Sequence, residues 1–288
     1  MSDLFPPFAP DPDEPKRRLF KPIPLRLLVP NLITLLALCL GLTAIRLAIE
    51  ERLELAIFAI AVAAVLDGLD GRIARLLKGT SRFGAELDSL SDFVNFGVAP
   101  PMLLYVFILH DMRSLGWIAA LVFAIAAALR LARFNVMLDD PNRPEWQKQF
   151  FVGMAAPAGA VTVMLPLYLN FVGIPGGGLP APVVGVYVVF IAFLMVSRIP
   201  TFSGKTFGSR VPRELVLPLF VLVVMFAALF VSFTFEVLAV STLLYLGALP
   251  FGFMRYRALE KADRLEKSAV RAHSPKVPPA ADGSPPAV

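Results

Sequence analysis

Two pairs of aspartates stand at helical spacing in the first third of the chain. Asp67 and Asp70 are three positions apart, and Asp88 and Asp92 are four apart. On a helix, such spacing presents both carboxylates of a pair on one face. Carboxylate oxygens are the ligands that hard divalent cations take in proteins, and two such ions about 3.5–4 Å apart can clamp a phosphoryl group during its transfer. The spacing therefore predicts a divalent-metal site suited to phosphate chemistry.

Two glycines accompany the aspartates. Gly71 lies on the face of the first pair, and Gly84 lies one turn before Asp88, so a bulky ligand can approach the backbone closely at both places. Close helix packing is the alternative explanation for Gly71. For the carboxylates, the alternative is that they cap helices or loops and form salt bridges with Arg72, Arg75 and Arg82. We favour the metal site, because four carboxylates on two matched helix faces exceed what capping requires.

The composition indicates a membrane protein. Of the 288 residues, 57% are hydrophobic, which is too many for a soluble domain of this size. The net charge is +5, but the basic residues cluster beside apolar segments and at the chain ends. This pattern favours contact with anionic lipid headgroups, and we expect no nucleic acid partner. The two histidines, His110 and His273, lie away from the aspartates, so a histidine-based zinc site is excluded there.

Eight segments are apolar and long enough to cross a hydrocarbon core, which needs about 20 residues. The sequence thus predicts an all-α integral membrane protein with about eight transmembrane helices. They span residues 27–48, 52–76, 84–109, 115–137, 151–173, 181–199, 214–233 and 236–253. The last two are expected to form a tight helical hairpin around residues 233–236. Residues 1–25 form a polar N-terminal segment, and residues 258–288 a basic tail that starts helical and ends disordered.

The basic residues predict the orientation of these helices. With both termini in the cytoplasm, only Arg46, Arg52 and Arg113 of the 27 lysines and arginines fall outside, in accord with the positive-inside rule. Segments 52–76 and 84–109 are then antiparallel neighbours with both aspartate pairs at their cytoplasmic ends. A carboxylate near the bilayer centre costs about 2.5–3.5 kcal/mol on insertion scales, and bound cations would compensate this cost. We expect a multi-pass protein of the inner membrane whose active site lies at the cytoplasmic face.

The aspartate motif resembles the signature of the CDP-alcohol phosphotransferase family. Residues 67–92 read Asp-x2-Asp-Gly-x2-Ala-Arg-x8-Gly-x3-Asp-x3-Asp, which matches that signature without a gap. The resemblance covers residues 26–200 and implies a six-helix catalytic core there. The two helices that the apolar segments predict in residues 201–257 are additional to this core. The resemblance further implies that the four aspartates bind two divalent cations, Mg²⁺ or Mn²⁺, and that Asp92 is also the general base on the acceptor hydroxyl.

The resemblance also implies contacts with the nucleotide. Gly71, Ala74, Arg75 and Gly84 would line the CDP pocket. Asn31 and Thr34, in the segment Pro30-Asn-Leu-Ile-Thr34, resemble contacts that the family makes on the nucleotide side. A homodimer is the assembly expected of the family.

Flanking segments are similar to those of the bacterial phosphatidylserine synthases, a branch of this family. These segments are residues 88–101, 130–135, 153–158 and 195–200, with departures at Ser91 and at Met154-Ala155. The resemblance implies CDP-diacylglycerol as donor and L-serine as acceptor. A carboxylate on the acceptor favours a guanidinium in the pocket, although arginines near helix ends also serve as interfacial anchors. The candidate contacts to the acceptor or to phosphate are Ser91, Asn95, Arg130, Arg133, Asn135 and Arg198.

Two alternatives remain open from the sequence. Other members of the family use glycerol 3-phosphate, inositol phosphate or choline as acceptor, and the aspartate motif does not choose among them. A cation-coupled transporter would also place carboxylates in a membrane. Transporters usually show repeated halves and broken helices at the midplane, whereas this sequence shows no internal repeat and carries its aspartates toward one face.

Overall fold

The computed structural model describes residues 25–77, 79, 81–138, 150–173, 178–197, 200–202 and 213–273. The predicted N-terminal segment, up to residue 24, and the predicted disordered end of the tail, from residue 274, lie outside these ranges. In chain order the elements are α1 (Leu25–Ile49), α2 (Leu53–Leu76), α3 (Arg82–Asp92), η1 (Phe93–Val98), α4 (Ala99–Phe107), η2 (Leu109–Met112), α5 (Ser114–Leu138), β1 (Phe150–Val152), α6 (Ala156–Val163), α7 (Leu165–Phe171), α8 (Ala181–Val196), β2 (Pro200–Phe202), α9 (Arg213–Ser232) and α10 (Thr234–His273).

The helices confirm a helical, multi-pass membrane protein. Five of those in the described ranges are long and apolar enough to cross a membrane: Leu28–Ile49, Arg82–Phe107, Ser114–Met137, Leu215–Ser232 and Thr234–Gly252. The other three predicted crossings are also helical. Of these, α2 carries the charges of the aspartate motif, while Ala156–Phe171 and Ala181–Val196 are apolar but shorter. Eight crossings therefore remain a prediction that depends on these three helices.

A short β-ribbon is the only strand pairing among the described residues. Strand β1 pairs with β2 in antiparallel register, with Phe150 opposite Phe202 and Val152 opposite Pro200. The ribbon joins the chain before α6 to the chain after α8, two places that are far apart in sequence. Three-residue strands flanked by long apolar helices give too little alternation for a sequence pattern to reveal them.

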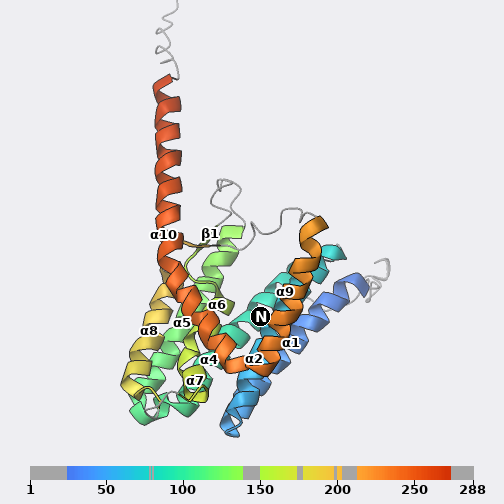
Figure 1. The fold of residues 1–288 in the computed structure, drawn as a ribbon, viewed down its shortest axis with the longest axis vertical. Coiled ribbons are helices and arrows are strands. Elements are labelled where there is room, and N and C mark those ends of the chain that lie inside the picture. The colour runs from blue at the N-terminus through green and yellow to red at the C-terminus, as the bar shows by residue number, and fades with distance from the viewer. Residues whose placement is uncertain are drawn as a thin grey trace, which may run out of the picture.

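Helices α1 and α2 pack side by side along their lengths (Figure 1). Both helices carry fully buried alanines, including Ala44 and Ala48 on α1 and Ala56 and Ala63 on α2. Small residues let two helix backbones approach closely, which is how helices associate in lipid, where apolar surface alone gives little driving force. This contact fixes the position of α2, which carries the first pair of aspartates.

The span that carries the second pair changes helix type along its length. Helix α3 begins after Ser81, whose side chain accepts a hydrogen bond from the backbone N–H of Gly84 at 2.9 Å. At Phe93, directly after Asp92, the chain continues as the π-helical turn η1 and then as α4. Such π-helical turns frequently occur at functional sites. Here the turn follows the last aspartate of the motif.

The two C-terminal helices differ in how they meet the rest of the protein. Helix α9 has no buried residues in its apolar span. A single residue, Phe233, separates α9 from α10. Helix α10 packs on α7, where the Phe235 and Phe171 rings stack with centroids 4.4 Å apart. Beyond the apolar span α10 continues to His273 as a helix that projects past the bundle (Figure 1), which confirms the helical start of the tail.

Candidate functional site

The four aspartates of the motif come together from two helices. Asp67 and Asp70 lie near the C-terminal end of α2, and Asp88 lies on α3. One carboxylate oxygen from each of these three lies within 4.8 Å of the others, a grouping that can hold a metal ion. The carboxyl group of Asp92, one turn after Asp88, lies next to that of Asp67. The predicted convergence of both pairs is therefore present in the structure.

The cluster fits a divalent cation. Asp92 Oδ1 is buried and has no hydrogen-bond partner among the described residues. Within the same ranges, none of the four aspartates forms a salt bridge, which removes the alternative of pairing with the neighbouring arginines. Those arginines, Arg72, Arg75 and Arg82, are exposed. Four carboxylates that form no salt bridge within the described residues, and that offer only oxygen ligands, suit a hard cation such as Mg²⁺ or Mn²⁺.

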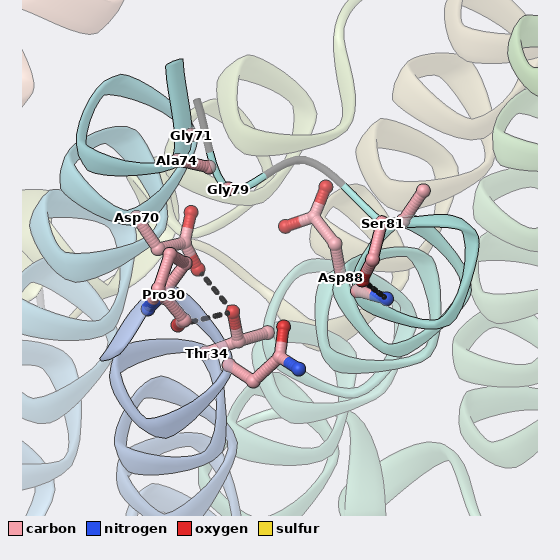
Figure 2. A pocket seen from close by; sticks show the side chains of 11 residues that line it. Pro30, Thr34, Asp70, Gly71, Ala74, Gly79, Ser81 and Asp88 are labelled. Carbon is pink, nitrogen blue, oxygen red and sulfur yellow. Dashed lines mark hydrogen bonds between the residues drawn. The ribbon is translucent and has the colours of Figure 1, made fainter. Parts of the chain in front are cut away.

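A cavity of about 150 Å³ opens beside the cluster (Figure 2). Asp70 and Asp88 face each other across it. Its walls combine polar side chains from all three helices with exposed backbone at the glycines. Its lining residues are Pro30, Asn31 and Thr34 from α1, Asp70, Gly71 and Ala74 from α2, and Gly79, Ser81, Gly84, Ala85 and Asp88 from the loop and α3.

Most of the predicted nucleotide contacts line this cavity. Asn31, Thr34, Gly71, Ala74 and Gly84 all do so. Arg75 is the exception, because its side chain is exposed and its Nε donates to the carbonyl of Gly71 at 3.0 Å. Sequence reasoning missed Gly79 and Ser81 as lining residues. The position of Ser81 could have been predicted, because a serine at the start of a helix, three positions before Gly84, is a typical N-cap.

The two motif glycines have different surroundings. A Cβ atom added to Gly84 would lie 2.7 Å from Asn31 Oδ1 and 3.1 Å from Ser81 Oγ, so the Asn31 side chain would have to move to make room for a side chain there. A Cβ added to Gly71 would meet nothing within 4 Å. The absence of a side chain at Gly84 therefore leaves room for the Asn31 side chain of α1. Gly71 instead leaves open space beside the cavity.

The predicted acceptor contacts separate into two groups. Several of them bind other parts of the protein. Ser91 Oγ donates to the carbonyl of Thr34 at 3.3 Å, and Asn95 Nδ2 donates to Ser91 Oγ at 3.2 Å. Asn135 Nδ2 donates to Ser89 Oγ at 2.9 Å. Arg133 Nη1 donates to the carbonyl of Val196 at 2.7 Å. These bonds account for their positions without an acceptor. Arg198 lies outside the described residues.

Arg130 is the predicted acceptor contact that the structure brings to the aspartates. Its side chain is buried, with 8% of the residue exposed. The guanidinium carbon lies 5.2 Å from the centroid of the Phe134 ring, and its charge interacts with that of Asp92. A buried cation is costly unless an anion compensates it. The arrangement can therefore hold an anionic group of a ligand next to the carboxylate cluster.

Comparison with known proteins identifies the family of the chain. The family described as CDP-alcohol phosphatidyltransferase matches residues 27–268, a range that includes α9 and most of α10. The CDP-diacylglycerol–serine O-phosphatidyltransferase of Mycobacterium leprae is 41% identical over 232 residues, covering 81% of this chain and 76% of the relative. Proteins with the same description from Helicobacter pylori strain J99 and Bacillus subtilis are 36% and 33% identical, covering 76% and 59% of this chain and 88% of each relative.

Proposed function

The chain belongs to the CDP-alcohol phosphatidyltransferase family, and we propose that it transfers the phosphatidyl group of CDP-diacylglycerol to the hydroxyl of L-serine and releases CMP. The observation that carries the chemistry is the convergence of four aspartates from α2 and α3 beside one cavity. The choice of serine rests on the relatives, which are described as serine O-phosphatidyltransferases over most of this chain.

We assign the aspartates to two divalent cations, Mg²⁺ or Mn²⁺. When bound, these ions would neutralise the diphosphate of the donor and stabilise the charge that develops as CMP leaves. Asp92 has a buried oxygen without a partner in the described structure, and it is our candidate for the general base. It would take the proton of the serine hydroxyl as that oxygen bonds to the phosphorus bearing diacylglycerol and the bond to CMP breaks.

The residues around the cluster would bind the two substrates. Asn31, Gly71, Ala74 and Gly84 line the cavity that we assign to CDP, and the open space at Gly71 lets the nucleotide reach the backbone. Arg130 is our candidate for the serine carboxylate, because a buried guanidinium next to Asp92 can bind a carboxylate with two hydrogen bonds. We expect Arg75 to act from the rim, since it does not line the cavity.

The proposed setting is the cytoplasmic face of the inner membrane. Both termini would lie in the cytoplasm, and membrane lipid would surround a six-helix core at 26–200 and the two further helices at 201–257. The acyl chains of the donor would then stay in lipid while CDP and serine arrive from the cytoplasm. We also propose a homodimer, on the strength of the family resemblance, and cross-linking of the protein in its native membrane would test it.

A reconstituted transfer assay tests the reaction. Membranes that contain the protein are incubated with CDP-diacylglycerol, Mn²⁺ or Mg²⁺ and labelled L-serine, and both labelled lipid and released CMP are measured. We expect serine-dependent labelling that EDTA abolishes. Asp92→Asn should lower kcat about 10²–10⁴-fold, the usual contribution of a general base. Asp111→Asn is the matched control, because Asp111 is exposed. Its one salt bridge within the described residues is to His110, at 3.2 Å.

The same assay separates the alternatives. Release of CMP with glycerol 3-phosphate, inositol phosphate or choline but not with serine would keep the family chemistry and overturn the acceptor. If folded protein releases CMP with none of these alcohols, phosphatidyl transfer is wrong and cation transport becomes the function to test.

A further inference from the structure

Thr34 lies where α1 meets both aspartate-bearing helices. It is buried, with 4% of the residue exposed, and it lines the cavity (Figure 2). The family resemblance suggests that this residue contacts the nucleotide. Its hydrogen bonds in the structure, however, run to the protein on both sides.

The hydroxyl of Thr34 is bonded to a predicted metal ligand. Thr34 Oγ1 lies 2.6 Å from Asp70 Oδ2 and 3.1 Å from the carbonyl oxygen of Pro30 (Figure 2). A hydroxyl has a single proton to donate, and the bond to a carboxylate is the shorter and stronger of the two. Thr34 therefore fixes the orientation of the Asp70 carboxylate and leaves Oδ1 of that residue free of this bond.

The backbone of Thr34 is bonded to the second aspartate helix. Its carbonyl accepts the hydroxyl of Ser91 at 3.3 Å, and Ser91 precedes Asp92 in the chain. Ser91 is 1% exposed and in turn accepts the amide of Asn95. Asn95 packs so tightly on α1 that a side chain at Gly41 would overlap it. One residue of α1 thus connects Asp70 on α2 with the segment of α3 that ends at Asp92.

We infer that Thr34 is a positioning residue for the metal ions, acting through Asp70 and through the contact between α1 and α3. This inference rests on the proposed metal-dependent transfer and adds to it a role that differs from nucleotide contact. Residues that bond to metal ligands orient them, and their loss typically weakens metal binding or activity about 10–100-fold.

Substitutions at Thr34 isolate its hydroxyl. Thr34→Ser and Thr34→Ala both lose the methyl group, and they differ only in the oxygen that bonds to Asp70. Thr34→Val removes the oxygen while it keeps the size of the side chain, and it serves if the alanine variant does not fold. Thr43→Ala is the control on the same helix, because Thr43 is exposed and its hydroxyl donates only to the carbonyl of Cys39, at 2.6 Å, in the described structure.

Mn²⁺ binding to the purified full-length protein is measured by electron paramagnetic resonance without substrate. In parallel, the transfer assay gives the Mn²⁺ concentration for half-maximal activity and the KM for CDP-diacylglycerol. We expect Thr34→Ala and Thr34→Val to raise the dissociation constant for Mn²⁺ about 10–100-fold. Thr34→Ser and Thr43→Ala should bind Mn²⁺ as the unaltered protein does.

Two results would overturn the inference. If Thr34→Ala raises the KM for the donor and leaves Mn²⁺ binding unchanged, Thr34 contacts the nucleotide instead. If Thr34→Ser binds Mn²⁺ as poorly as Thr34→Ala, packing of the methyl group is responsible. The binding measurement needs no turnover, so a hydroxyl-dependent loss of Mn²⁺ affinity would support the role of Thr34 even if serine proved to be the wrong acceptor.

Discussion

Arg130 and Arg133 stand three positions apart on α5, yet their guanidinium groups have different surroundings. Arg133 donates to the carbonyl of Val196 near the end of α8, and so it joins two helices. Arg130 is buried over Phe134, and its charge interacts with that of Asp92. At the scale of single residues, this contrast separates a candidate for substrate binding from a structural arginine.

The contrast gives a prediction for serine binding. Arg130→Gln should raise the KM for L-serine about 10–100-fold, because a hydrogen bond to a charged group contributes about 1.5–3 kcal/mol and about 1.4 kcal/mol corresponds to a factor of ten. Initial rates over a series of serine concentrations provide the measurement. Arg133→Gln is the control and should leave this KM unchanged. Equal effects of the two substitutions would mean that Arg130 does not recognise the acceptor.

The two motif glycines give a second prediction at this scale. Gly84→Ala would place a methyl group 2.7 Å from Asn31 Oδ1, so we expect it to lower the unfolding temperature and to raise the KM for CDP-diacylglycerol. Gly71→Ala meets no protein atom within 4 Å, so it should raise this KM and leave the unfolding temperature almost unchanged. Thermal unfolding in detergent and donor kinetics test both. A normal donor KM for Gly71→Ala would show that CDP does not occupy the space beside it.

At the scale of elements, the positions of many helices could be predicted from the sequence, because the length of an apolar segment and the spacing of charges are local properties of the chain. The predicted segment 52–76 corresponds to α2 at Leu53–Leu76, and 115–137 to α5 at Ser114–Leu138. The spacing of the aspartates also predicted their convergence. The π-helical turn after Asp92 and the pairing of β1 with β2 depend on tertiary contacts. Local sequence patterns therefore do not predict them. For the same reason, the sequence could not distinguish Arg130 from Arg133.

Packing between elements predicts which aromatic side chains stabilise the fold. Phe235 of α10 stacks on Phe171 of α7, and such pairs contribute about 0.5–1.5 kcal/mol beyond the area they bury. Phe235→Ala should therefore lower the free energy of unfolding by at least about 1 kcal/mol. Phe220→Ala is the matched control, because Phe220 on α9 is 69% exposed. Equal stability of the two variants would mean that α10 does not depend on this contact.

At the scale of the whole molecule, the distribution of basic residues and the position of the aspartates together predict on which side of the membrane the aspartate cluster lies. If Arg46, Arg52 and Arg113 mark the outer side, the loop between α2 and α3 lies in the cytoplasm, and the metal cluster lies near that face. The donor nucleotide and serine can then reach the site without crossing the membrane. A reversed orientation would place the same cluster on the outside, where a supply of CDP-linked donor headgroups would be needed.

Cysteine labelling in intact cells tests this orientation. Cys39 is replaced by serine, since it is exposed and the sequence has no other cysteine. Single cysteines are then introduced as Ser114→Cys, at the start of α5, and Arg82→Cys, at the start of α3, both at exposed positions. A membrane-impermeant maleimide should label position 114 in intact cells and position 82 only after permeabilisation. The reverse pattern would move the aspartates to the outer face and would remove the argument that the cytoplasm supplies both CDP-linked donor and acceptor.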